Sequence, residues 1–101
     1  MAWIMEMKLK SRRVTSVNKI FAIEKNNVEE FLQALNSNDL WGGSGSLADC
    51  ALNDCQNGIS EADAQFFYAQ MIKLGEYIIE NVPNSNPRIP SWLEFFRWSS
   101  D

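Results

Sequence analysis

Three of the five glycines in this 101-residue chain fall within Leu40-Trp41-Gly42-Gly43-Ser44-Gly45-Ser46-Leu47-Ala48-Asp49. Amphipathic helical patterns lie on both sides of this stretch. Glycine is used where the backbone needs a positive φ or where another group approaches closely. The sequence therefore places a sharp corner between two helices here, beside an indole and a carboxylate, and this corner is the first place to look for function.

Two interpretations of the glycine loop, residues 42–46, are open. A tight corner needs only the glycines, with Trp41 and Leu47 holding two helices together, and this interpretation is favoured. A ligand loop would offer free amides to an anion or a peptide terminus, although the Walker lysine and the strand of a Rossmann fold are both missing and Asp49 would repel an anion. The candidate residues for a ligand or partner are Trp41, Gly42, Gly43, Ser44, Gly45, Ser46 and Asp49.

The segment before the loop has the pattern of an amphipathic helix. Asn27 with Glu30 resembles a capping box, in which each side chain satisfies a free backbone amide. The turn-forming residues 36–39 end this helix. Its apolar stripe, at the spacing i, i+3, i+4 and i+7, consists of Val28, Phe31, Leu32 and Leu35.

The segment after the loop predicts a second, shorter helix. Ser46 with Asp49 forms a plausible start, because serine is a preferred helix cap. The apolar pattern runs through Leu52, and the polar residues 53–58 are expected to end the helix in a turn.

The longest predicted helix runs from a cap at Ser60 to about Val82. Two adjacent apolar stripes indicate a wide buried face, so we expect this helix to be central. Gly75 costs such a helix about 1 kcal/mol relative to alanine, and close approach of a neighbouring helix would explain it. The stripes are Phe67, Met71, Leu74, Ile78 and Val82, and Ala64, Tyr68, Ile72, Gly75 and Ile79.

A proline-containing connection and a short aromatic helix complete the chain. Pro83, Pro87 and Pro90 predict an extended segment without helix. Ser91 with Glu94 resembles another capping box and is expected to begin the last helix.

Residues 1–25 give the least decisive pattern. Met5, Met7 and Leu9 alternate with polar residues as in a strand, yet the segment is also rich in good helix formers, and a helix is favoured over a basic hairpin. The fold class predicted for residues 1–101 is therefore all-α, a single-domain bundle of four to five helices with a glycine-rich corner. The alternative is α+β with an N-terminal β-hairpin.

Length and composition are those of one globular domain with a hydrophobic core. The chain is 46% hydrophobic and 12% aromatic, which argues against disorder. Its most apolar run, residues 66–79, is interrupted by charged residues and is shorter than the ~20 residues that span a membrane. The basic residues near the N-terminus follow the apolar ones, unlike a secretory signal. We expect a cytoplasmic protein without a membrane partner.

The chain has no histidine and two cysteines, Cys50 and Cys55. Serine–histidine and cysteine–histidine catalysis are thereby excluded, and two thiols cannot complete a zinc site. A reducing compartment would keep both cysteines as thiols. We expect a protein that is not an enzyme and that has no cofactor or metal.

Charge is distributed unevenly along the chain. Residues 1–25 hold six basic and two acidic residues, a net charge of +4, and residues 26–101 hold three basic and eleven acidic residues, a net charge of −8. An ordinary solvated surface accounts for this pattern. The functional alternatives are a nucleic-acid-binding segment from Lys8 to Lys25, which the overall acidity argues against, and an acidic face for a basic partner.

Aromatic residues are concentrated near the C-terminus. The candidate interface consists of Trp92, Phe95, Phe96, Arg97 and Trp98. One short helix cannot bury all four rings on one side, and aromatic residues and arginine are enriched at interfaces. The helix either folds back over the bundle as a lid or contacts a partner, which could be a second copy of the chain.

The segment Trp41-Gly42-Gly43-Ser44-Gly45-Ser46-Leu47-Ala48-Asp49 resembles the signature Tyr-Gly-Gly-Met-Gly-Ser-Phe-Asn-Asp of a family of small uncharacterised bacterial proteins. The resemblance extends from about Val28 to Ile79. The departures from the signature include Trp41, Ser44 and Ala48. The resemblance implies an all-helical fold. It implies nothing about activity, because the function of that family is unknown.

The function expected from the sequence is that of a small protein-interaction module. An immunity or antitoxin-like inhibitor is the most concrete version, because an acidic face speeds the capture of a cationic partner. The alternative is a small-ligand or anion binder that uses the glycine loop.

Overall fold

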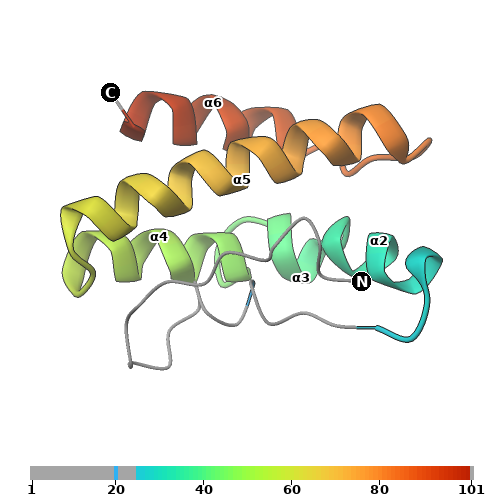
Figure 1. The fold of residues 1–101 in the computed structure, drawn as a ribbon, viewed down its shortest axis with the longest axis horizontal. Helices are drawn as coiled ribbons and strands as arrows, with labels where there is room; N and C mark the ends of the chain where they lie inside the picture. The colour runs from blue at the N-terminus through green and yellow to red at the C-terminus, as the bar shows by residue number, and fades with distance from the viewer. Residues whose placement is uncertain (1–19, 21–24, 101) are drawn as a thin grey trace.

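The computed structural model describes Ile20 and residues 25–100 (Figure 1). This part of the chain forms helices α2 (Val28–Leu35), α3 (Asn38–Trp41), α4 (Leu47–Asn57), α5 (Glu61–Asn81) and α6 (Ile89–Ser100). It contains no strand. The predicted all-α fold is thereby confirmed for the described residues.

Two predictions concern residues outside this part of the chain. The choice between helix and hairpin for residues 1–25 and the basic segment considered for nucleic acid lie outside the described residues, except for Ile20 and Lys25.

Helix α5 lies in the middle of the molecule, as its two apolar stripes predict. Figure 1 shows α6 along one side of α5 and α4 along the other, with α3 and α2 continuing the layer of α4. The side chains of α5 that are buried between these layers are Ala64, Phe67, Tyr68, Met71, Leu74 and Ile78. They join Phe31 and Leu35 of α2 and Leu93 and Phe96 of α6 in one core.

Local capping determines where three of the helices begin. The Asn27 side chain accepts from the N–H of Glu30, the Ser46 hydroxyl from the N–H of Asp49, and the Ser60 hydroxyl from the N–H of Asp63. Each cap satisfies an amide that has no partner within its helix. The starts predicted at Asn27, Ser46 and Ser60 are confirmed.

The predicted end of the second helix is wrong. Helix α4 continues past Leu52 to Asn57. The Asn57 side chain donates back to the carbonyl of Asn53 at 2.9 Å, and Cys55 is buried against the core. Burial of one face therefore outweighs the turn preference of the polar residues 53–58.

Two further boundaries differ from the sequence prediction. The turn predicted over residues 36–39 contains the start of α3, a single helical turn. Helix α6 begins at Ile89, before the box predicted at Ser91, and the N–H of Trp92 already donates to the carbonyl of Arg88 at 3.3 Å. Pro90 is accommodated in the first turn, where its missing N–H needs no helical partner.

Gly75 lies where α5 and α6 approach most closely. A Cβ built there would meet the side chain of Leu93 and would lie 3.0 Å from Cγ2 of Ile89. The expected reason for a glycine inside the longest helix, close approach of a neighbour, is confirmed.

Candidate functional site

The glycine loop joins α3 to α4 through two residues with left-handed backbones. Gly43 has a φ of +99° and Gly45 a φ of +84°, values that favour glycine. The N–H of Ser46 donates to the carbonyl of Gly43 at 3.0 Å, and the N–H of Gly45 donates to Asp49 Oδ2 at 3.1 Å. The loop is therefore a hydrogen-bonded turn, and its Ser46 side chain caps the N-terminus of α4.

Trp41 connects this corner to both neighbouring layers. Its side chain is completely buried, and its indole N–H donates to the carbonyl of Leu35 at 2.6 Å. Its own carbonyl accepts from the indole N–H of Trp92 at 2.8 Å. The structure thus brings together two candidate sites that are 51 residues apart in the sequence, the glycine loop and the aromatic segment of α6.

Three asparagines fix the connection between α5 and α6. The Asn86 side chain donates to the carbonyl of Asn36 at 3.1 Å and to Asn38 Oδ1 at 2.8 Å. Its Oδ1 accepts from the backbone N–H of Arg88 at 3.0 Å. Asn86 is buried, so these bonds satisfy a polar group that water cannot reach. The cluster holds Arg88 and the start of α6 beside the glycine loop.

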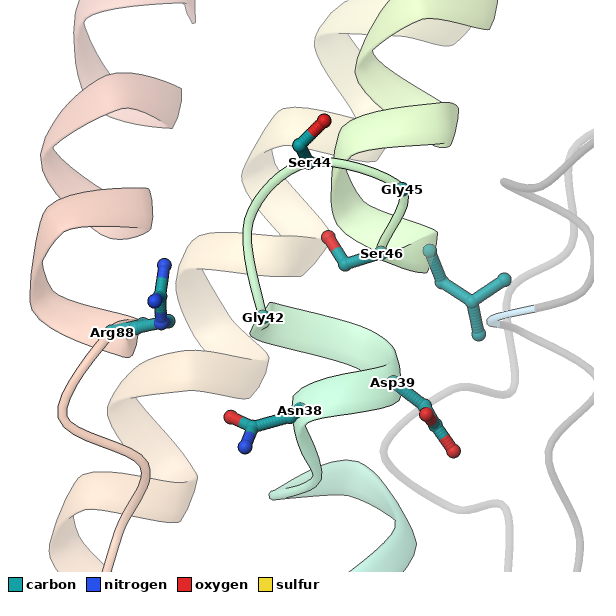
Figure 2. A pocket seen from close by; sticks show the side chains of 8 residues that line it. Asn38, Asp39, Gly42, Ser44, Gly45, Ser46 and Arg88 are labelled. Carbon is teal, nitrogen blue, oxygen red and sulfur yellow. The ribbon is translucent and has the colours of Figure 1, made fainter.

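The side chain of Arg88 lies against Gly43. A Cβ at Gly43 would be 2.9 Å from Nη1 of the guanidinium, so no larger residue fits there without movement. Figure 2 shows Arg88 on one side of the loop and Asp39 pointing toward the other side. The guanidinium makes no hydrogen bond or ion pair within the described part of the chain, whereas Arg97 pairs with Glu76 at 3.0 Å.

Arg88 lines two neighbouring pockets. One, shown in Figure 2, is lined by Asn38, Asp39, Gly42, Ser44, Gly45, Ser46, Leu47 and Arg88. The other, which we name the Arg88 pocket, has a volume of about 300 Å³ and is lined by Gly43, Arg88, Ser91, Trp92 and Phe95. No acidic residue lines the Arg88 pocket.

The aromatic residues of α6 divide between the core and the surface. Phe96 is completely buried and stacks with Trp92 at a centroid distance of 5.5 Å. Phe95 and Trp98 are exposed, to 39% and 75%, and their rings meet edge to face at 6.1 Å. One face of α6 is thus the lid of the bundle, while two large rings are left on the surface.

Arg97 of α6 forms an ion pair with Glu76 of α5. Both side chains are more than half exposed. Exposed ion pairs contribute little, about 0–1 kcal/mol. Arg97 therefore belongs to the contact between α5 and α6 and does not extend the exposed pair of rings.

Both cysteines are free thiols, Cys50 half-buried and Cys55 buried. Burial, with a smaller contribution from the charge of Asp54, raises the pKa of Cys55 to about 12. The thiolate is the reactive form of cysteine, so Cys55 is a poor nucleophile at neutral pH. Burial also raises the pKa of Tyr68, with a further contribution from Cys55.

Two kinds of feature are absent from Ile20 and residues 25–100. No group of three cysteine, aspartate or glutamate residues there is arranged to hold a metal ion. No helix in the same residues has the length and apolar character that crossing a membrane requires.

The chain matches no family model, no curated protein and no solved structure. Its resemblance to the family with the Tyr-Gly-Gly-Met-Gly-Ser-Phe-Asn-Asp signature stays a prediction.

Sequence reasoning missed Arg88 and the asparagine cluster. The relevant residues lie in two segments about fifty positions apart, 36–38 and 84–88, and neither segment has a pattern that points to the other. The high asparagine content of both was the available signal, because asparagine side chains commonly satisfy the backbone of irregular segments.

Proposed function

We propose that this protein is a small interaction module that binds a basic protein partner through the outer face of α6, which we define as Glu94, Phe95 and Trp98. The observation that carries the proposal is the 75% exposure of Trp98 beside a second exposed ring. Tryptophan is the residue type most enriched at the energetic centres of interfaces. An exposed indole adds nothing to the core of a monomer.

The arrangement of these three residues supports a single docking surface. Phe95 and Trp98 are three positions apart, and Glu94 and Trp98 are four apart, so all three project from one side of the helix. In Figure 1, no described element covers the side of α6 that faces away from α5. A partner could contact both rings and the carboxylate at once.

The charge of the molecule favours a basic partner. Residues 25–100 contain ten acidic side chains and only four basic ones, Lys25, Lys73, Arg88 and Arg97. Opposite charge accelerates the encounter of two proteins and is screened by salt. The specific role we propose is that of an immunity or antitoxin-like inhibitor, which captures a cationic protein and blocks it.

The test is a binding titration of the purified chain against the basic proteins encoded by its neighbouring genes. We expect one of them to bind, with an association rate that falls as salt increases. Trp98→Ala should weaken binding at least tenfold, because truncation of a central anchor typically costs about 2 kcal/mol or more. Val28→Ala is the matched control, since Val28 is an exposed apolar residue on α2.

Three outcomes would contradict this function. The first is that no neighbouring product binds at low salt. The second is that Trp98→Ala and Val28→Ala bind as tightly as the unmodified chain. The third is a concentration-dependent dimer in light scattering that Trp98→Ala abolishes, because the face would then be an interface between two copies of the chain.

A further inference from the structure

We propose that the Arg88 pocket is a binding site for a carboxylate carried on an apolar group. This pocket shares Phe95 with the docking surface of α6, but the proposal does not depend on that surface, because the group that binds the carboxylate is the guanidinium of Arg88.

The guanidinium of Arg88 has no acidic partner in the described part of an acidic chain, and no carboxylate lines the Arg88 pocket. Arg97, nine positions further along the chain and within α6, does have such a partner in Glu76. Asp49, which the sequence suggested would repel an anion, does not line this pocket, and its carboxylate accepts from the N–H of Gly45.

The backbone of Arg88 is held beside the glycine loop, and its exposed side chain lies over Gly43. The backbone N–H donates to buried Asn86, and the guanidinium occupies space that a side chain at position 43 would fill. The φ of +99° at Gly43 is needed for the turn, and its missing Cβ leaves room for the guanidinium. The charged group therefore lies at the mouth of the Arg88 pocket, where the exposed side chain can adjust to a ligand.

The groups around the Arg88 pocket indicate the class of ligand that it would bind. A guanidinium offers a planar fork of donors that matches the two oxygens of a carboxylate. The N–H of Gly43 and the hydroxyl of Ser91 donate to no described residue and are available as further donors. Trp92 and Phe95 form an apolar wall beside these groups. At about 300 Å³ the pocket is at the small end for ligand sites, the size of one apolar side chain with its carboxylate.

N-acetyl-phenylalanine is the probe for this site, and N-acetyl-phenylalaninamide is its neutral control. In calorimetric titrations of the full chain we expect the acid to bind at least tenfold more tightly than the amide. The indole N–H resonance of Trp92 should shift on addition of the acid. Inorganic phosphate, which lacks an apolar group, should bind more weakly than the acid.

Matched variants assign the binding to the pocket. Arg88→Gln should weaken binding of the acid at least tenfold, and Arg88→Lys should weaken it less, because lysine keeps the charge without the fork. Arg97→Gln, which removes the other arginine of this part of the chain, should bind as the unmodified chain does. Trp98→Ala should also leave acid binding unchanged, which separates this proposal from the function proposed for the outer face of α6.

The proposal would be overturned if the acid did not bind, or if the amide or inorganic phosphate bound as tightly as the acid. It would also be overturned if Arg88→Gln and Arg97→Gln weakened binding of the acid equally. A pentapeptide ending in phenylalanine identifies the source of the carboxylate. Tighter binding of this peptide than of N-acetyl-phenylalanine supports the terminus of a partner chain, and equal binding supports a small acid.

Discussion

Gly75 shows how one missing methyl group determines the distance between two helices. In an exposed helix, replacing glycine with alanine gains about 1 kcal/mol. Here the new Cβ would collide with Leu93 and crowd Ile89, both buried. Because overpacking costs about 1–3 kcal/mol, we expect Gly75→Ala to lower the unfolding free energy by about 1 kcal/mol in net terms.

Urea unfolding of Gly75→Ala checks this prediction. Ala69→Gly, at an exposed position of the same helix, is the control and should lose about 1 kcal/mol through helix propensity alone. A more stable Gly75→Ala variant would mean that a methyl group fits between α5 and α6 at this position without overpacking.

The burial of Cys55 makes the unfolding free energy depend on pH in the alkaline range. Its pKa is raised from 9.0 to about 12 by burial, so the native state keeps the proton where the unfolded chain has lost it. The resulting contribution to stability is complete below pH 9 and is lost as pH rises toward 12. We therefore expect the unfolding free energy of Cys55→Ala to fall less steeply above pH 9 than that of the unmodified chain.

The measurement is urea unfolding at neutral pH and at about pH 10. Cys50→Ala is the control and should follow the slope of the unmodified chain. Burial is the larger cause of the raised pKa of Tyr68 and is kept in all three proteins, whereas the smaller contribution from Cys55 is lost in Cys55→Ala, a change in the same direction as the expected flattening. Equal slopes for Cys55→Ala and the unmodified chain would contradict the prediction.

At the scale of the element, the sequence predicts helix starts better than helix ends. Starts at Asn27 and Ser60 are correct because one side chain and an amide three residues away decide them. The end of α4 is wrong because burial of Cys55 against other helices extends it. The placement of Arg88 beside Gly43 could not be predicted, since two segments 45 positions apart create it.

The connection between α5 and α6 owes its position to one buried side chain. Asn86→Ala would leave the N–H of Arg88 and the carbonyl of Asn36 without their present partner. A buried polar group without a partner costs about 1–3 kcal/mol, and we expect the unfolding free energy to fall by that amount.

Asn84→Ala is the matched control for this connection. Asn84 is exposed, and it contributes only its backbone carbonyl to the network, as acceptor from the Asn36 side chain. Its substitution should change stability by no more than about 0.5 kcal/mol. Similar losses in both variants, measured by thermal unfolding, would show that the connection is not fixed by Asn86.

For the whole molecule, the open question from the sequence was whether α6 is a lid or an interface. The structure assigns the two roles to opposite faces, with Phe96 buried in the core and Trp98 75% exposed. Removing a buried phenylalanine typically costs about 3–5 kcal/mol, so Phe96→Ala should lower the unfolding free energy by about that amount. Trp98→Ala should stay within about 0.5 kcal/mol of the unmodified chain.

Chemical denaturation of the two variants, with their circular dichroism spectra, decides between these expectations. A stable Trp98→Ala variant means that the exposed indole does not stabilise the monomer. Selection for binding would then explain why a tryptophan occupies this position. A large loss of stability in Trp98→Ala would instead make both faces of α6 part of the lid. The rings of Phe95 and Trp98 would then contribute to the fold, and the docking surface proposed for a basic partner would have no support from their exposure.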